Sequence, residues 1–290
     1  MSLALPVISF VLGLMLADRF PKLKRYLAQL LSQFLIPYVI VYNMVFYQPG
    51  SINLIAFSLL SSAILYAFYL CMSTDKVQAL CISYPNLAWL GFPVAFAIFG
   101  DQVSAAMVSL YIGGSLFGNV IAVAALSPQI NSVSYFIQRI LKSPPVIALA
   151  IATILRLTGI QHWQSHDIAD GLYEFVKVAT SFAGMFVLGM WMRHTKILGS
   201  DLVFALRQAL IRLSIGVGIC ILTWYVFHFA QVDQYIAVML MIFFLPPGAN
   251  IVSLETYYAG TGKSAQYIAA GTVVSCGLLL FYGLFIHWLY

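Results

Sequence analysis

The stretch SYPNLAWLGFP, residues 83–93, interrupts an apolar segment that is otherwise long enough to cross a membrane. A proline inside a helix removes one backbone hydrogen bond and clashes with the preceding turn, so two prolines around a glycine predict a kink or an opening. A second interruption, LPPGAN at residues 245–250, predicts a break in a later apolar segment. Such breaks persist in hydrocarbon only where protein or a water-lined cavity satisfies the freed backbone groups.

The composition indicates a membrane protein. Of the 290 residues, 62% are hydrophobic and 8% are charged. A soluble globular chain carries about 25% charged residues, so this chain cannot cover a folded surface with polar groups. A soluble enzyme, a nucleic-acid binder and a disordered protein are thereby excluded.

Ten apolar stretches follow one another along the chain, and a helix needs about 20 such residues to span a bilayer. They cover residues 2–17, 27–47, 52–72, 77–99, 102–126, 144–160, 171–192, 203–229, 234–258 and 264–289. We therefore predict an all-α polytopic membrane protein with ten transmembrane helices. The eighth stretch is longer than one span requires, so we expect its first turns, with Arg207 and Arg212, to project into the cytoplasm.

Basic residues predict the orientation of these helices. Of the 14 Lys and Arg residues, 12 fall in odd-numbered connections between stretches, and only Arg156 and Lys177 fall in even-numbered ones. Because cytoplasmic loops carry the excess of basic residues, the odd-numbered loops are predicted to be cytoplasmic and both termini to lie outside. We expect an integral multi-pass protein of the bacterial inner membrane.

The polar loop 127–143 divides the ten stretches into five and five. An odd number of spans in each half gives the halves opposite topologies, as in many secondary transporters. We therefore predict a first five-helix repeat at 1–126, a cytoplasmic linker at 127–143 and a second, inverted repeat at 144–290. The interruptions fall in helices 4 and 9, at matching positions of the two repeats, so these broken helices are predicted to cross.

Two broken helices that cross would form an anion site. Each second half-helix points its free N–H groups toward the crossing, and anions bind at such ends. Gly248 lets a ligand approach the backbone, the amides of residues 248–250 are predicted donors, and the Asn86 and Asn250 side chains add neutral polar groups. Neither broken helix has a basic residue near its break, so backbone and amide groups would hold the anion.

Two acidic residues fall inside predicted spans. Glu255, one turn from the cytoplasmic end of the ninth stretch, is a candidate for proton coupling, because acids inside a membrane are functional candidates; the alternative is a solvated interfacial group. Glu174, in the first turn of the seventh stretch, is predicted to be solvated at the outer face.

Enzyme signatures are missing from the chain. It has no H-E-x-x-H motif, no pair of mid-membrane aspartates and no G-x-S-x-G spacing. Its four cysteines lie in apolar stretches without a C-x-x-C pair. We expect no enzyme, no metal and no cofactor.

The pattern from Pro85-Asn86 to Gly91-x-Pro93, followed by FGD at 99–101, resembles the fourth-helix signature of the auxin efflux carrier family. That family includes plant PIN-type exporters and short bacterial members. LPPG at 245–248 resembles the break of its ninth helix. The resemblance implies ten helices in two inverted five-helix repeats, with helices 4 and 9 crossed around an organic-anion site.

The resemblance also implies roles for individual residues. Asn86 would hold the substrate carboxylate, and Asn119 on the fifth stretch would face the crossing as a further polar group. Ala183 and Gly184 stand where the family pattern has a proline in the seventh helix. The resemblance suggests a homodimer as well.

We therefore predict a secondary active transporter, with efflux as the expected direction, of a small organic anion such as a mono- or dicarboxylate or an auxin-like acid. Alternating access around the crossing of helices 4 and 9 is the expected mechanism. The candidate substrate-binding residues are Asn86, Pro85, Gly91, Pro93, Asn119, Pro246, Pro247, Gly248 and Asn250. The expected partners are the anion and the lipid bilayer, without nucleic acid. Two alternatives stay open: a sodium-coupled carrier of the bile-acid symporter type, and a membrane sensor that binds the anion without transporting it.

Overall fold

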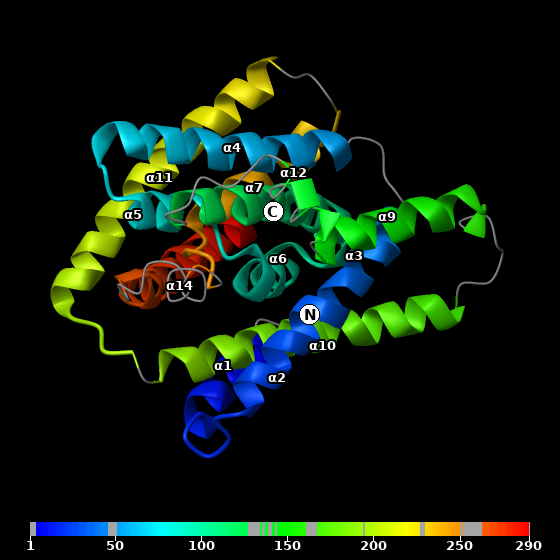
Figure 1. The fold of residues 1–290 in the computed structure, drawn as a ribbon, viewed down its shortest axis with the longest axis horizontal. Helices are drawn as coiled ribbons and strands as arrows, with labels where there is room; N and C mark the ends of the chain where they lie inside the picture. Colours follow the sequence, from blue (N-terminus) through cyan, green and yellow to red (C-terminus); the bar gives the residue numbers. More distant parts are fainter. Residues whose placement is uncertain are drawn as a thin grey trace.

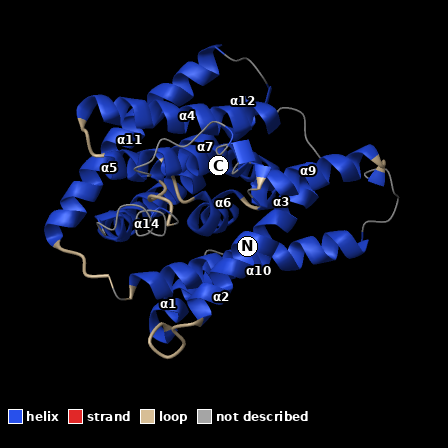
Figure 2. Cartoon of the chain, viewed as in Figure 1, coloured by secondary structure: helices blue, strands red, loops and turns tan. Residues whose placement is uncertain are grey.

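The structure is a computed structural model that describes residues 4–45, 51–126, 134, 137–138, 141–142, 144–160, 167–193, 195–226, 230–249, 251 and 263–289. The described residues form helices joined by short loops, with no strand among them (Figures 1 and 2). Each of the ten predicted apolar stretches is helical over most of its described residues.

The helices before the loop 127–143 include two π-helical turns, η1 and η2, and one 3₁₀ turn, η3. They are α1 (Ala4–Leu16), α2 (Leu23–Leu30), η1 (Leu31–Leu35), α3 (Ile36–Val45), α4 (Ser51–Met72), α5 (Lys76–Ser83), η2 (Leu87–Gly91), α6 (Phe92–Phe99), η3 (Asp101–Val103) and α7 (Ser104–Leu126). After the loop come α9 (Pro144–Leu157), α10 (Asp167–Met192), α11 (Gly199–Val226), α12 (Ala230–Met241), the 3₁₀ turn η5 (Ile242–Phe244) and α14 (Lys263–Leu289).

Five helical segments of the described chain are long and apolar enough to cross a membrane. They are Leu23–Val45, Ile52–Met72, Ala169–Met192, Gly199–Val226 and Ser264–Trp288, and four shorter apolar helices accompany them. Large apolar side chains on the helix surfaces are strongly exposed, for example Leu157 at 83% and Trp288 at 81%. Extended exposed apolar surface is typical of contact with lipid or a partner. The fold is therefore all-helical and compatible with a multi-pass membrane protein.

The helices pack in two bundles, and each bundle takes helices from both halves of the chain. In the first bundle α1 packs along α10 and α3 along α9, and Figure 1 shows α1 and α10 side by side. In the second bundle α4 packs on α5 and α7, and α11 packs on α12 and α14. The turn η2 lies between the bundles, against α10 of the first and α6 and α7 of the second. The segments 1–126 and 144–290 are thus interleaved.

Glycines bring α1 and α10 into backbone contact. A Cβ atom at Gly13 would lie 2.1 Å from the Phe186 carbonyl oxygen. A Cβ atom at Gly189 would lie 2.2 Å from the Phe10 carbonyl oxygen. Small residues permit this close approach of helices, which is common where lipid surrounds them.

Replacing Gly189 with alanine is expected to push α1 away from α10 and to lower the thermal unfolding midpoint of the purified protein by several degrees. This loss should occur although alanine is the better helix former by about 1 kcal/mol. Gly218→Ala on α11 is the matched control, because the added Cβ would meet no atom of another described segment within 4 Å. Its midpoint should equal or exceed that of the unchanged protein, and equal midpoints for the two variants would contradict the close packing.

Candidate functional site

The fourth apolar stretch breaks at Tyr84. Helix α5 ends at Ser83, and Tyr84 adopts an extended conformation with φ −108° and ψ 95°. Asn86 then caps η2, because its side-chain oxygen accepts a hydrogen bond from the Trp89 N–H at 3.1 Å. The break therefore lies at the first proline of the motif, while Pro93 lies in α6 directly after the π-helical turn η2, which runs into α6 without a break.

The later stretch breaks at Leu245, and its extended backbone pairs with the first break. The Asn86 N–H donates to the Pro246 carbonyl oxygen, and the Gly248 N–H donates to the Tyr84 carbonyl oxygen, both at 2.8 Å. The two interruptions that were predicted from sequence thus lie side by side. We call residues 84–86 and 245–248 the crossing.

Two prolines of the crossing, Pro85 and Pro247, occupy positions that need no N–H group. Pro85 and Pro247 face each other as an isolated antiparallel bridge, and the two hydrogen bonds come from the residues on either side. In a pair of this kind the N–H groups of the facing residues point away from the partner strand. Proline therefore breaks each helix here without removing a bond of the bridge.

A cavity of about 130 Å³ lies beside the crossing. At the roughly 30 Å³ that each water takes up in the liquid, it has room for about four waters. Its walls come from α3, the crossing, η2 and α7, so it lies where the two bundles meet. The lining residues are Ile36, Tyr84, Pro85, Asn86, Leu87, Ala88, Trp89, Tyr111, Ser115, Gly248 and Ala249.

Asn86 presents an unpartnered donor at this cavity. The residue is 4% exposed, and its Nδ2 has no hydrogen-bond partner in the described part of the chain. Because the side-chain oxygen caps η2, the amide nitrogen is the end that a ligand meets. A buried donor without a partner costs about 1–3 kcal/mol, which a ligand with an acceptor group would offset.

The structure brings together five of the predicted site residues. Pro85, Asn86 and Gly248 line the cavity, and Pro246 and Pro247 complete the crossing. The two others with described side chains, Gly91 and Pro93, lie further along η2 and α6, outside the cavity lining. Asn250 and Glu255 lie outside the described residues, as does the side chain of Asn119, whose backbone belongs to α7.

One predicted role is wrong in this structure. The Gly248 amide was expected to donate to a ligand, but its hydrogen bond goes to the Tyr84 carbonyl. Tyr84 itself packs against α7, where a Cβ at Gly118 would lie 2.3 Å from the Tyr84 ring. The donor that the crossing leaves open is a side-chain group, Asn86 Nδ2.

Gly184 of α10 packs against the backbone one turn before Pro93. A proline at this position lacks the N–H that would bind the Trp89 carbonyl four residues earlier. A Cβ at Gly184 of α10 would lie 2.7 Å from that carbonyl oxygen. Gly184, which stands near the proline of the family pattern, thus gives η2 the space to pack on α10.

Arg212 is not where the sequence analysis predicted, and that prediction is wrong. It lies near the middle of α11, is 5% exposed, and donates from Nε to the Phe243 carbonyl oxygen at 2.8 Å. Gly216, one turn later, makes room for the Phe243 ring, which would lie 2.3 Å from a Cβ there. A buried cation therefore contacts the end of the first half of the ninth stretch.

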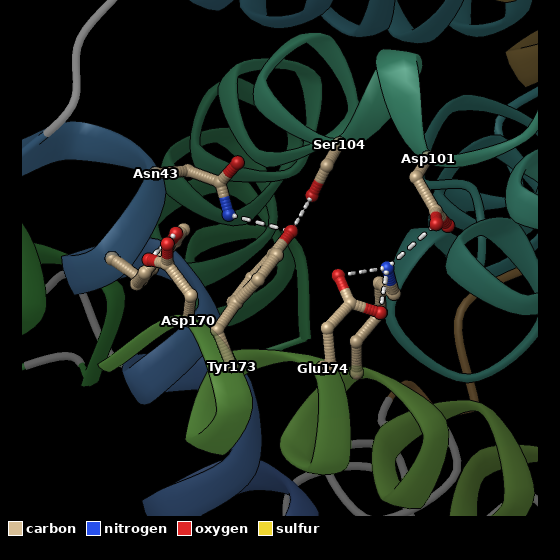
Figure 3. A network of polar contacts seen from close by, with 8 residues as sticks. Asn43, Asp101, Ser104, Asp170, Tyr173 and Glu174 are labelled. Carbon is tan, nitrogen blue, oxygen red and sulfur yellow. Dashed lines mark hydrogen bonds and ion pairs between the residues drawn. The ribbon is translucent and has the colours of Figure 1, made fainter. Parts of the chain in front are cut away.

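A polar network joins the bundles at the far end of α6, as Figure 3 shows. Lys177 of α10 is 1% exposed and forms ion pairs with Asp101 of η3 at 2.9 Å and with Glu174 at 2.6 Å. Glu174 is 57% exposed, as predicted for a solvated group, and its carboxylate forms this ion pair with Lys177. Tyr173 of α10 hydrogen-bonds to Ser104 of α7. The network therefore links α10 of the first bundle to η3 and α7.

A further contact in the network comes from within the first bundle. Asn43 of α3 donates from Nδ2 to the Tyr173 hydroxyl at 3.2 Å (Figure 3). The Tyr42 ring stacks on that of Tyr173 with centroids 3.9 Å apart, and its hydroxyl donates to Asp170 at 2.6 Å. These contacts hold Tyr173 in place between α3 and α7.

The fold and the site together define an all-helical protein, compatible with several passes through a membrane, with two interrupted helices paired beside a cavity. No profile of a known protein family matches the chain, and no curated protein matches it significantly. Among the described residues, no group of three or more His, Cys, Asp or Glu side chains could hold a metal ion.

The network yields a stability prediction. Lys177→Met keeps the length of the buried side chain but removes its charge-assisted hydrogen bonds, each worth about 1.5–3 kcal/mol. We expect a clear fall in the thermal unfolding midpoint. The control is Arg193→Met, which removes the ion pair of Arg193 with Asp18, in which both side chains are more than half exposed. An exposed pair contributes about 0–1 kcal/mol, so a similar fall in both variants would contradict a special role for Lys177.

Proposed function

We propose that this protein is a secondary active transporter of a small organic anion, and that the carboxylate of its substrate binds Asn86 in the cavity at the crossing. One observation carries the proposal: Asn86 Nδ2 is buried, has no described partner and lines a cavity where the two bundles meet. Secondary transporters bind substrates where broken helices meet, with the N-terminus of a half-helix directed at the anionic group. Residues Leu87–Phe99 form such a half-helix here.

The arrangement of the bundles supports the proposed architecture of ten helices in two inverted repeats. The first bundle contains the first two predicted helices of each half, and the second bundle contains the last three of each half. Two structurally equivalent repeats would pack in this way.

The proposed transport cycle moves one bundle against the other, because the cavity lies at their boundary. The Lys177–Asp101 ion pair and the Tyr173–Ser104 hydrogen bond cross that boundary. The distribution of basic residues predicts that these groups face outside. They would therefore hold the outer side closed and part when the cavity opens outward.

Arg212 supports a cycle without sodium. In transporters with broken helices, coupling cations bind at the carbonyl ends of half-helices. Here the guanidinium of Arg212 already contacts the Phe243 carbonyl at the end of such a half-helix. The positive charge that a sodium ion would bring is part of the chain.

Counterflow in proteoliposomes tests the proposal, with labelled acetate, succinate and indole-acetate as probes. We expect the unchanged protein to exchange at least one probe. The affinity for that probe should be roughly ten- to hundredfold weaker in Asn86→Ser, because the variant loses a hydrogen bond to a charged group. Serine is a good cap, so this variant should keep its unfolding midpoint, whereas Asn86→Ala should lose about 1 kcal/mol of helix capping.

The outcomes of this experiment separate the alternatives. Stabilisation by a probe without exchange would favour the membrane sensor. Undiminished exchange by Asn86→Ser would show that the anion binds elsewhere, and no binding or exchange of any probe would contradict the proposal as a whole.

Replacing sodium with choline on both sides of the membrane is expected to leave the exchange rate unchanged, since Arg212 supplies the positive charge at the half-helix. The rate is measured in the same proteoliposomes with the probe that exchanges best. Loss of exchange in choline, restored by added sodium, would instead support the sodium-coupled carrier.

A further inference from the structure

We infer that a second anion site lies in a separate cavity, where Arg212 provides the positive charge. This cavity of about 40 Å³ lies between α5, α11 and α14 and is bounded at the crossing by Pro247. It shares no lining residue with the cavity at Asn86. The inference concerns binding alone and does not depend on the proposed transport.

One face of α11 forms the polar wall of this cavity. Asp201, Ala205, Gln208, Ala209 and Arg212 all line it, and their spacing of three or four residues places them on one side of the helix. Gln78 of α5 and Ser275 of α14 line it from the neighbouring helices. The cavity thus combines a cation near the middle of α11 and a carboxylate toward its start with neutral hydrogen-bonding groups.

Arg212 uses only part of its hydrogen-bonding capacity in the described part of the chain. A guanidinium carries five N–H donors and keeps its charge in proteins. In the described part of the chain, its one hydrogen bond runs from Nε to the Phe243 carbonyl, and none of the ion pairs includes it. The four N–H donors at the end of the guanidinium are therefore open to a ligand.

Asp201 does not neutralise Arg212. It is eleven residues earlier on α11, which corresponds to about 16 Å along the helix axis. Its carboxylate accepts hydrogen bonds from the Leu198 N–H at 2.9 Å and from Gln266 Nε2 at 3.1 Å. It lies toward the start of α11, whereas Arg212 lies near its middle.

The charge and the size of the cavity define the ligand. A buried charge is costly unless it is paired, and an arginine cannot escape that cost by losing its proton. An anion in the cavity would supply the missing partner. The volume is little more than the roughly 30 Å³ that one water takes up in the liquid, which matches a halide ion or a single carboxylate group. Gln208 Oε1 is buried and has no hydrogen-bond partner among the described residues, so it provides an acceptor for a water or hydroxyl that accompanies the anion.

Thermal unfolding of the purified protein tests this site, and the five tryptophans provide the fluorescence signal. The protein is kept in gluconate, which is too large for the cavity, and chloride, bromide or acetate replaces it at constant ionic strength. We expect a saturable rise of several degrees in the unfolding midpoint. A rise with acetate alone identifies a carboxylate group as the ligand, and a rise with the halides as well identifies a small free anion.

Two variants decide the assignment to Arg212. Arg212→Met removes the charge and should abolish the rise. Ala209→Leu keeps Arg212 but fills the cavity, so it should also abolish the rise in the unfolding midpoint. This variant tests the site if Arg212→Met does not fold. A rise of unchanged size in Ala209→Leu, or no rise in the unchanged protein, would overturn the inference.

Asn86→Ser separates the two cavities. Because they share no lining residue, this variant should keep the part of the rise that Arg212→Met abolishes. Loss of that part in Asn86→Ser would assign the anion to the other cavity and overturn the inference. If the unfolding midpoint rises in an Arg212-dependent way but the protein exchanges no probe, the result would contradict the transport proposal and still support the second anion site.

Discussion

Backbone groups that leave a helix inside an apolar interior need new hydrogen-bond partners. In this protein each of the two helix breaks supplies partners for the other. Two hydrogen bonds hold the crossing together: the Gly248 N–H donates to the Tyr84 carbonyl, and the Asn86 N–H donates to the Pro246 carbonyl. Unsatisfied groups in such surroundings cost several kcal/mol each, so neither break is stable alone. The cavity, the capped half-helix and the contact of α11 with Phe243 all depend on this pairing.

The same constraint shows why side chains rather than backbone amides are open to ligands here. Once the two breaks pair, the amide of Gly248 is occupied, and the donor left over is Asn86 Nδ2. On the neighbouring helix, Arg212 uses one donor to satisfy a carbonyl and keeps the others. A neutral donor and a buried cation thus lie in separate cavities around one structural element, which allows each to bind anions of a different kind.

Local features of the molecule were predictable from the sequence, and contacts between distant segments were not. Apolar runs and helix-breaking residues predicted the helical stretches and both breaks, because proline acts on its own turn. The partner of Gly248 depends on how two extended segments far apart in the chain align with each other, which no local pattern encodes. Arg212 was expected to project into the cytoplasm, although apolar residues flank it on both sides. Its burial depends on the contact between Gly216 of α11 and Phe243 of η5.

Each bundle contains helices from both halves of the chain, and this has a consequence for biosynthesis. At about 5–20 residues per second, the ribosome needs roughly ten to thirty seconds to add the 160 or so residues between the two breaks. During that time Tyr84 and Asn86 are in place without their partners from 246–248. The first half therefore awaits the second as an incomplete intermediate, which must be shielded by water, lipid headgroups or the insertion machinery until the last helices arrive.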